Sequence, residues 1–456
     1  MLDVLIVSAN QERMPDPVPP LGATYIAAAV RAAGHRVEIY DACFAKDRGA
    51  GELAAKLDLL KPAVVGLSIR NVDNVAYPRA VSYLPVYEEF VRVIRQHAPK
   101  AKLVMGGSAF TLFPEEFIER LGADFGVVGE GEKLFVRLLD DLDRFGEPKE
   151  AFPALRGPKK NLLYAGNLKD LDAPVLPARD LIDLARYYRE GGSANLQTKR
   201  GCVYKCSYCT YPALEGTHVR EREPRAVVDE IEEVRAKHGI EYFFFVDNVF
   251  NFPPSHAAAV CEELIRREVK ISWTAYVTPA GCSRELLGLM ARSGCKSIDF
   301  GTDAASDSML RAYQKPFRVK EVLDVSAGCH ELGIKFNHSL ILGGPTETWE
   351  TVHETVENIH RSKPTAVIAV MGVRLYRDTA VSELAIAEGL VTREQIGLAP
   401  LFYVSEEVRE GLPDYLAKVS EEHKNWVVPG LMKKLNERYF ERVRAKGVKG
   451  PLWELL

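Results

Sequence analysis

Three cysteines in C-x3-C-x2-C spacing constrain this chain more than any other feature of its sequence. Cys202, Cys206 and Cys209 lie in the stretch Lys-Arg-Gly-Cys-Val-Tyr-Lys-Cys-Ser-Tyr-Cys. Three thiolates can bind three irons of a [4Fe–4S] cube, which leaves the fourth iron without a protein ligand. An open metal position is typical of catalytic rather than structural sites. The spacing therefore predicts a reactive iron–sulfur cluster on a glycine-led loop.

A zinc knuckle is the main alternative for the same three cysteines. It needs a fourth Cys or His, and the next candidate, His218, lies nine residues beyond Cys209 in a polar run with no second ligand beside it. The other cysteines stand singly among apolar residues, which indicates core packing: Cys43, Cys261, Cys282, Cys295 and Cys329. The cluster is the favoured interpretation.

Charge and hydropathy exclude several classes of protein. Lys and Arg number 59 against 63 Asp and Glu in 456 residues, a net charge of −4, so bulk electrostatics gives no reason to expect a nucleic-acid partner. The first residues, Met1 to Ser8, read as a strand rather than a signal peptide, and no apolar run approaches 18 residues. Together with thiols kept free for iron, this predicts a cytoplasmic protein without a membrane span.

Apolar strands alternate with amphipathic helices over residues 1–145. The predicted strands are Val4–Val7, Val37–Tyr40, Val64–Ile69, Leu103–Met105 and Phe125–Val128. This alternation predicts a doubly wound parallel sheet, in which ligands bind at the carboxyl ends of the strands. Polar and glycine residues follow three of these ends: Asn10; Ser68, Arg70 and Asn71; Gly106, Gly107 and Ser108. Glycines there let a ligand approach the backbone.

Prolines and weak periodicity predict a linker over residues 146–193, with a short helix near 179–188. Strand–helix alternation then resumes over 194–375. The six predicted strands are Ala194–Thr198, Tyr242–Val246, Ser272–Val277, Ser297–Phe300, Lys335–Leu342 and Ala366–Val373. Six such units predict a partial (β/α)6 barrel whose first strand leads into the cysteine loop. Residues 376–456 read as charged helical segments, including 429–444, that form a C-terminal cap.

The cysteine motif, with Tyr208 just before its last Cys, resembles the radical S-adenosylmethionine (SAM) superfamily. The resemblance implies that SAM binds the open iron and that one electron, from an external donor of the flavodoxin or ferredoxin type, cleaves it to a 5′-deoxyadenosyl radical. It also implies SAM contacts at the strand ends, from Tyr208, Asp247, Asn248, Gly301, Asp303, Gly343 and Gly344. Taken singly, Asp303 can equally cap a helix and the glycine pair can be a plain turn.

The first domain resembles the cobalamin-binding domain that precedes many radical SAM cores. The resemblance assigns the nucleotide tail of cobalamin to the loops that hold Ser68 and Gly106–Ser108. One departure is that the first loop contains no histidine, so cobalt is expected to lack a histidine ligand, with Arg70 or Asn71 near its lower face. The alternative is a doubly wound domain that has kept its shape and lost its ligand.

The end of the last predicted barrel strand is similar to an arginine-and-tyrosine segment of cobalamin-associated radical SAM proteins. The family segment reads Tyr-Pro-Gly-Thr, whereas this chain has Tyr376-Arg377-Asp378-Thr379. Arg374, Tyr376 and Arg377 are therefore candidate substrate ligands, since arginine forks suit carboxylates and phosphates. Surface charge is the alternative reading for both arginines.

These resemblances imply a cobalamin-dependent radical SAM enzyme, most readily one that methylates an unactivated carbon of a small molecule or peptide. The protein then positions its cofactors and contains the radical. A radical rearrangement, a cyclisation, or transfer of another SAM-derived group such as aminocarboxypropyl is the second hypothesis. The third is a cobalamin- or cluster-sensing protein without turnover.

Overall fold

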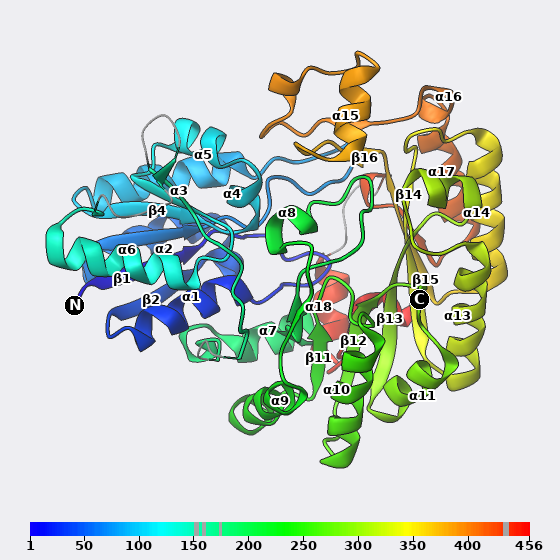
Figure 1. Ribbon diagram of the computed structural model, residues 1–456, viewed down its shortest axis with the longest axis horizontal. Coiled ribbons are helices and arrows are strands. Elements are labelled where there is room, and N and C mark those ends of the chain that lie inside the picture. The colour runs from blue at the N-terminus through cyan, green and yellow to red at the C-terminus, as the bar shows by residue number, and fades with distance from the viewer. Residues whose placement is uncertain (150–154, 157–160, 173–175, 432–436) are drawn as a thin grey trace.

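Two seven-stranded sheets, each covered by helices, form the body of the molecule. The computed structural model describes residues 1–149, 155–156, 161–172, 176–431 and 437–456. In Figure 1 the first sheet and its helices lie on the left, in blue to cyan, and the second sheet lies on the right, in green to yellow. The predicted α/β class with parallel sheets is confirmed.

The first sheet has the strand order β2-β1-β3-β4-β5-β7-β6, and all its neighbours are parallel except β6 and β7. In β1, Leu5 and Val7 pack into one core and Val4 and Ile6 into another, so helices cover both faces of the sheet, as predicted. The strands are β1 (Asp3–Ser8), β2 (Arg36–Asp41), β3 (Val64–Ser68), β4 (Lys102–Gly106), β5 (Phe125–Val128), β6 (Leu155–Arg156) and β7 (Leu162–Tyr164). The helices are α1 (Leu21–Ala32), α2 (Gly49–Leu60), α3 (Leu84–His97), α4 (Ser108–Leu112), α5 (Pro114–Leu121) and α6 (Glu132–Phe145), with short 3-10 turns η1 (Ala42–Phe44) and η2 (Lys46–Arg48).

One expectation for residues 146–193 needs correction, because this stretch contains regular elements. β7 pairs in parallel with β5 and extends the first sheet. A three-residue strand among prolines is too short to show the period of two on which strand prediction rests. The expected helix near 179–188 is present as a 3-10 turn, η3 (Arg179–Leu181), followed by α7 (Leu184–Gly191). The domain boundaries themselves stay predictions.

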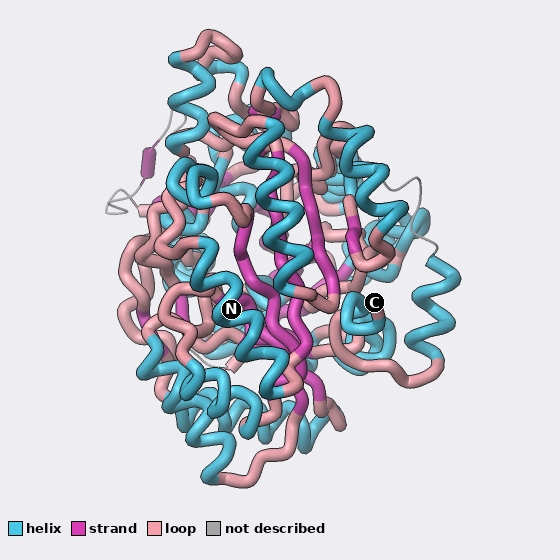
Figure 2. The backbone as a smooth tube through the Cα atoms, turned by 90° about the vertical axis from the view of Figure 1, so that its right-hand side faces the viewer, coloured by secondary structure: helices cyan, strands magenta, loops and turns pink. Residues whose placement is uncertain are grey.

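The second sheet is an open barrel of parallel strands in the order β8-β11-β12-β13-β14-β15-β18. All six predicted strands are present, and β18 from the tail adds a seventh. The strands are β8 (Ala194–Leu196), β11 (Tyr242–Phe245), β12 (Ser272–Val277), β13 (Cys295–Asp303), β14 (Lys335–Leu342), β15 (Ala366–Met371) and β18 (Trp426–Val427). Figure 2 shows strands running through the centre of the molecule with helices packed around them.

Helices cover the outer face of the barrel and leave its inner face as a lumen. Phe243, Trp273 and Ile298 point outward into a core shared with the surrounding helices. These helices are α9 (Pro224–His238), α10 (Pro254–Arg266), α11 (Arg284–Arg292), α12 (Asp307–Ala312), α13 (Val319–Leu332) and α14 (Trp349–Ser362). Between the barrel and the first domain lie α8 (Tyr211–Glu215) and two small antiparallel pairs, β9 (Lys199–Arg200) with β10 (Arg220–Glu221) and β16 (Val373–Arg374) with β17 (Phe402–Tyr403).

The tail is mainly helical, as predicted. It holds α15 (Ala380–Ala387), η4 (Arg393–Gln395), α16 (Glu406–Arg409), α17 (Leu412–Glu422), η5 (Pro429–Leu431), α18 (Glu437–Ala445) and η6 (Leu452–Leu455). The helix predicted over 429–444 falls partly on residues 432–436, outside the described residues. In η6, Glu454 accepts a hydrogen bond from Ser297 Oγ at 2.6 Å and another from Tyr242, so the tail closes the barrel at the strand starts. No helix in the described part of the chain is long and apolar enough to cross a bilayer.

Candidate functional site

The three motif cysteines lie together on the loop between β9 and α8. Gly201, which precedes them, has a φ of +94°, and a side chain there would run into a backbone carbonyl. The Cys202 N–H donates to Gly216 O at 3.1 Å, and the Cys209 N–H donates to Cys206 O at 3.1 Å. These bonds turn the loop back on itself and leave all three thiols partly exposed.

The chemistry of these donors fits a cluster better than a single metal ion. Burial raises the pKa of Cys209 to about 12 and also raises the pKa of Cys202 and of Cys206, so these thiols remain protonated at neutral pH in the absence of a metal. Among the described residues, no three Cys, His, Asp or Glu side chains are grouped as the ligands of one ion are. In a [4Fe–4S] cube each thiolate binds a different iron, so the sulfurs need not converge on one point. The arrangement therefore does not support a zinc knuckle.

A buried cation, Lys315, lies beside the cysteine loop. Its Nζ donates to Asp303 Oδ2 at 2.6 Å, and the Tyr208 hydroxyl donates to the same carboxylate. Burial lowers the pKa of Lys315, but the negatively charged groups around it, Asp303 above all, raise it and leave that pKa above its ordinary value. Sequence reasoning missed Lys315, because a lone lysine after a short helix carries no motif. It brings Asp303 and Tyr208, both predicted site residues, into one cluster.

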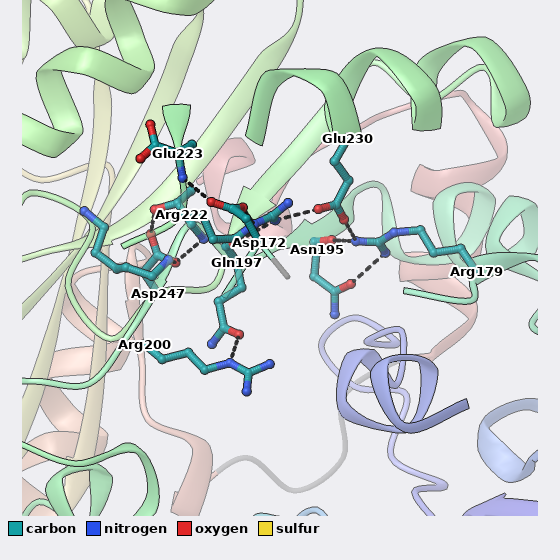
Figure 3. A network of polar contacts seen from close by, with 11 residues as sticks. Asp172, Arg179, Asn195, Gln197, Arg200, Arg222, Glu223, Glu230 and Asp247 are labelled. Atoms are coloured by element: carbon teal, nitrogen blue, oxygen red, sulfur yellow. Dashed lines mark hydrogen bonds and ion pairs between the residues drawn. The ribbon is translucent and has the colours of Figure 1, made fainter. Parts of the chain in front are cut away.

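An ionic network fixes the strand that leads into the cysteine loop (Figure 3). Glu230 on α9 accepts from Arg179 NH2 at 2.9 Å and from Arg222 NH1 at 2.6 Å, and all three side chains are buried. Arg179 also donates to the backbone of Asn195 in β8 at 2.7 Å, and the Asn195 amide donates to Pro19 O in the first domain at 2.8 Å. These bonds attach the first barrel strand both to α9 in the barrel and to the first domain.

The side chains of Asp247 and Asn248 both form hydrogen bonds with other parts of the protein. Asp247 is fully buried and accepts from the backbone N–H groups of Thr198 and Lys199 at 2.7 and 3.1 Å. Asn248 Nδ2 donates to Glu215 Oε2 at 2.7 Å, and the Gly201 N–H donates to the same oxygen at 3.0 Å. Both predicted SAM ligands therefore hold the cysteine loop in place, and their direct contact with SAM stays a prediction.

A cavity of about 400 Å³, within the range of small-molecule sites, lies between the two domains. The first domain contributes the carboxyl ends of β1, β3 and β4, and the barrel side contributes Tyr211, Leu214 and Glu215 of α8 with Val246 after β11. Of the seven residues predicted to meet cobalamin, six line this cavity: Asn10, Ser68, Arg70, Gly106, Gly107 and Ser108. Asn71 is not among its lining residues, and its carbonyl instead accepts from the Tyr87 hydroxyl at 2.6 Å.

Gly107 lines the cavity at a position where the backbone leaves no room for a side chain. Its φ is +103°, and a Cβ would lie 2.5 Å from the carbonyl oxygen of Ile69. The next residue, Ser108, donates its hydroxyl to Arg70 O at 2.7 Å, which joins the loops after β3 and β4. The Arg70 side chain is exposed toward this space.

Ion pairs across the cavity join the domains. Glu130 and Glu132, at the end of the first sheet, meet Arg220 Nη1 at 2.8 Å and Arg200 Nη1 at 2.8 Å respectively. Both arginines come from the β9–β10 pair that flanks the cysteine loop. Sequence reasoning missed these pairs, because their partners lie far apart in the chain.

The inward-facing side of the barrel strands carries aromatic and polar side chains. Tyr276 is 45% exposed although β12 is an inner strand whose outer face is covered, so its side chain must face the lumen. The Phe244 ring lies 4.9 Å from the Tyr276 ring between centroids. Beside Tyr276 in the strand register, Asp299 accepts a hydrogen bond from Asn337. Burial raises the pKa of Asp299 to about 7, although the bond from Asn337 lowers it. The sequence predicted these strands, but it did not predict which of their side chains face the inside of the barrel.

Two predicted glycines lie where the chain leaves β14. Gly343 has a φ of +89°, and its N–H and that of Gly344 donate to the buried carboxylate of Glu347. A Cβ on Gly344 would strike the Tyr313 hydroxyl, so the glycine pair is needed for packing as well as for a turn. By contrast, a Cβ on Gly301 would meet no atom within 4 Å.

Arg374, Tyr376 and Arg377 are engaged in contacts between the domains. Arg374 Nε lies 2.9 Å from Asp73 Oδ2, with both side chains almost completely buried, and Tyr376 stacks on Phe113 at 5.9 Å between ring centroids. Arg377 pairs with Glu116 and donates to Ile396 O at 3.1 Å. Their predicted role as substrate ligands is untested and stays a prediction.

Comparison with known proteins agrees with this two-part arrangement. Residues 11–139 match the profile of the B12 binding domain, and residues 196–359 match that of the Radical SAM superfamily. The chain is 26% identical to tryptophan 2-C-methyltransferase of Streptomyces laurentii, over 82% of this chain and 72% of that protein. It is 24% identical to an uncharacterized methyltransferase of Pyrococcus horikoshii, over 93% of this chain and 94% of that protein.

Further similarity is found among cyclases and solved structures. An anaerobic magnesium-protoporphyrin IX monomethyl ester cyclase of Cereibacter sphaeroides is 28% identical over 74% of this chain and 55% of that protein. The radical SAM methyltransferase TsrM of Kitasatospora setae, solved with tryptophan and a SAM analogue, superposes with a TM-score of 0.87 at 23% identity, over 99% of this chain and 96% of that one. The fold predicted from the sequence is thus the fold of that enzyme.

Proposed function

We propose that this chain, which joins a B12-binding domain to a radical SAM domain, is a cobalamin-dependent enzyme that methylates a carbon atom of a small molecule. The observation that carries the proposal is the cavity between the domains. Arg70 and Gly107 line it from the first domain, and Tyr211, two residues after the last motif cysteine, lines it from the other side. A cofactor held by the first domain would therefore sit next to the cysteine loop.

The residues divide among three cofactors. In the proposal Cys202, Cys206 and Cys209 bind the [4Fe–4S] cluster, and the cavity residues named above bind cobalamin. SAM lies among Tyr208, Asp303 and the Gly343–Gly344 turn, at the carboxyl ends of the barrel strands. When bound, the cluster and cobalamin supply SAM cleavage and methyl carriage. Lys315 places a positive charge next to the thiolates and offsets part of the negative charge of the cluster.

No histidine is among the described residues that line the cavity. His35 is buried beside the start of β1, where its Nδ1 accepts from the Leu2 N–H at 3.1 Å, and His97 pairs with Asp58 at 2.9 Å. This supports the expectation that cobalamin bound here would lack a histidine ligand to cobalt. Of the two side chains expected near cobalt, Arg70 or Asn71, Arg70 lines the same cavity. A guanidinium is a poor metal ligand, because it stays protonated.

The lumen supports a planar substrate. Phe244 and Tyr276 offer an aromatic wall, and Asp299 with Asn337 offers hydrogen-bond acceptors on the neighbouring strands. A small aromatic or heteroaromatic compound with an N–H group fits this combination. Tryptophan, the substrate named for two similar methyltransferases, has this chemistry. An external electron donor and a reducing compartment belong to the same proposal.

Anaerobic purification followed by counts of iron, sulfide and cobalamin tests the cofactor assignment, and product mass tests the reaction. With SAM and tryptophan present, methylation adds one methyl group to the substrate. The similarity to cyclases keeps ring closure as a second candidate, and it would instead lower the product mass by the hydrogens removed. If the protein bound neither cobalamin nor iron after reconstitution, both candidate functions would be refuted.

A further inference from the structure

A second cavity, of about 450 Å³, lies on another side of the loop that follows β1. It is formed by three parts of the chain: the first-domain loops around η1 and η2, the helix α7 and the helix α18. Asn10 and residues 18–20 of the β1–α1 loop line the cavity between the domains, whereas residues 13–15 and 17 of the same loop line this one. The two cavities therefore share one loop as a wall.

Positive charge dominates this second cavity. Six cationic side chains line it against two carboxylates, Glu190 and Glu441, and the cations are Arg13, Lys46, Arg48, Arg186, Arg189 and Arg444. Glu190 is shared by three arginines, with nitrogens of Arg13, Arg186 and Arg189 at 3.0, 2.7 and 3.9 Å. Two further carboxylates pair with the cations from outside the lining, Asp16 with Arg444 and Glu52 with Arg48 at 3.3 Å. Six cations against these four carboxylates leave an excess of positive charge. Concave walls focus such a field on an anion inside.

The packing holds two of these arginines in place before any ligand arrives. The guanidinium of Arg186 lies over the ring of Phe44, 4.1 Å from its centroid. Arg444 donates to Asp16 at 2.5 Å and lies so close to Gly192 that a Cβ there would strike its guanidinium. The Nε atoms of Arg13 and Arg444 are buried without a hydrogen-bond partner. Preorganised donors with unused capacity are what an anion site needs.

We propose that this cavity binds a small phosphorylated anion with at least two negative charges, and that the bound anion fixes the wall it shares with the cavity between the domains. Guanidinium forks bind phosphate oxygens in pairs, which favours phosphoryl groups over chloride. A concave site of this volume suits a small molecule rather than the flat surface of a protein partner.

Calorimetric titration of the full-length, cofactor-loaded protein with inorganic pyrophosphate tests the site. We expect the double variant Arg13→Gln/Arg186→Gln to bind pyrophosphate at least about tenfold more weakly than the wild type, since it loses two charge-assisted contacts. Arg31→Gln, which removes an exposed arginine paired with Asp180, is the matched control and should bind as the wild type does. Absence of binding to the wild type, or equal binding by all three proteins, would overturn the proposal.

A variant that should bind pyrophosphate more tightly shows whether weaker binding by the double variant comes from the lost arginines or from misfolding. Glu190→Gln removes the carboxylate that three arginines share, so it should bind pyrophosphate more tightly than the wild type. Weaker binding by Glu190→Gln would count against the site.

Sedimentation with phosphatidylglycerol vesicles separates a lipid headgroup from a soluble phosphate. We expect that the protein does not sediment with the vesicles. Sedimentation with the vesicles that depends on Arg13 and Arg186 would refute the small-molecule assignment.

Discussion

Gly106 and Gly107 are neighbours in sequence, yet only one of them requires glycine. A Cβ at Gly107 would lie 2.5 Å from a backbone oxygen at a φ of +103°, whereas a Cβ at Gly106 would lie 3.6 Å from its nearest neighbour. We predict that Gly107→Ala destabilises the protein by about 1–3 kcal/mol and lowers its cobalamin content. Gly106→Ala should change both much less. Thermal unfolding and cobalamin absorbance measure the difference, and equal effects of the two variants would contradict the assigned strain.

Replacement of Cys202, Cys206 and Cys209 by alanine should remove the reconstituted iron and all SAM cleavage while the protein stays folded. The reason is that the loop carries the cluster outside the hydrophobic cores. Cys261→Ala, at a fully buried thiol, is the control and should retain iron at a modest cost in stability. Iron and sulfide analysis with circular dichroism checks this. Full iron content in the triple variant would exclude these ligands.

Asp299 should make stability depend on pH. Burial raises its pKa in the folded state to about 7, above the value of about 4 of an unfolded aspartate, so folding binds a proton between these values. Its contribution is therefore fully present below about pH 4 and is lost as pH rises through 7. We predict that Asp299→Asn flattens the fall in unfolding temperature between pH 5 and 7.5. An unchanged slope would show that Asp299 is already ionised in the folded protein.

At the scale of elements, the sequence pattern predicted the strands of the two large sheets except three short ones, β6, β7 and β18. An apolar run was enough for β1, and mixed stretches that end in apolar residues were enough for β12 and β14. β7 and β18 have three and two residues, and their pairing is decided by contacts with distant strands. Similarly, the cysteine spacing predicted the loop, but Lys315 and the pair Glu130–Arg220 could not be found, because charge partners brought together by folding leave no local pattern.

The ionic network on α9 offers a test of how an element supports the cysteine loop. Glu230→Gln leaves two buried arginines facing a neutral amide, so we expect a loss of about 3–5 kcal/mol and poorer retention of iron. Glu233→Gln, on the same helix, breaks only an exposed pair with Lys237 at 2.6 Å and should cost well under about 1 kcal/mol. Denaturant unfolding and iron content measure both effects, and similar losses in the two variants would contradict the role of the network.

At the scale of the whole molecule, the two sheets act as one enzyme only if their carboxyl ends stay opposed across the cavity. Contacts at two ends of this interface maintain that arrangement. Arg200 and Arg220 pair with the first domain beside the cysteine loop, and Arg374 pairs with Asp73 beside β16. Methyl transfer between cofactors needs near contact of the reacting atoms, so small rotations of one domain should uncouple the two halves of the reaction.

The Asp73–Arg374 pair separates this structural role from the substrate role that the sequence suggested. If the arginine joins the domains, Asp73→Asn and Arg374→Met should each destabilise the protein by about 3–5 kcal/mol, and the double variant should lose much less than the sum. SAM cleavage should persist while methylated product falls, because the cofactors no longer hold their spacing. If Arg374 instead binds substrate, Asp73→Asn would release the guanidinium and lower the KM. Unfolding free energies and the ratio of 5′-deoxyadenosine to methylated product therefore decide between the two roles, and a lowered KM with additive stability changes would overturn the interface assignment.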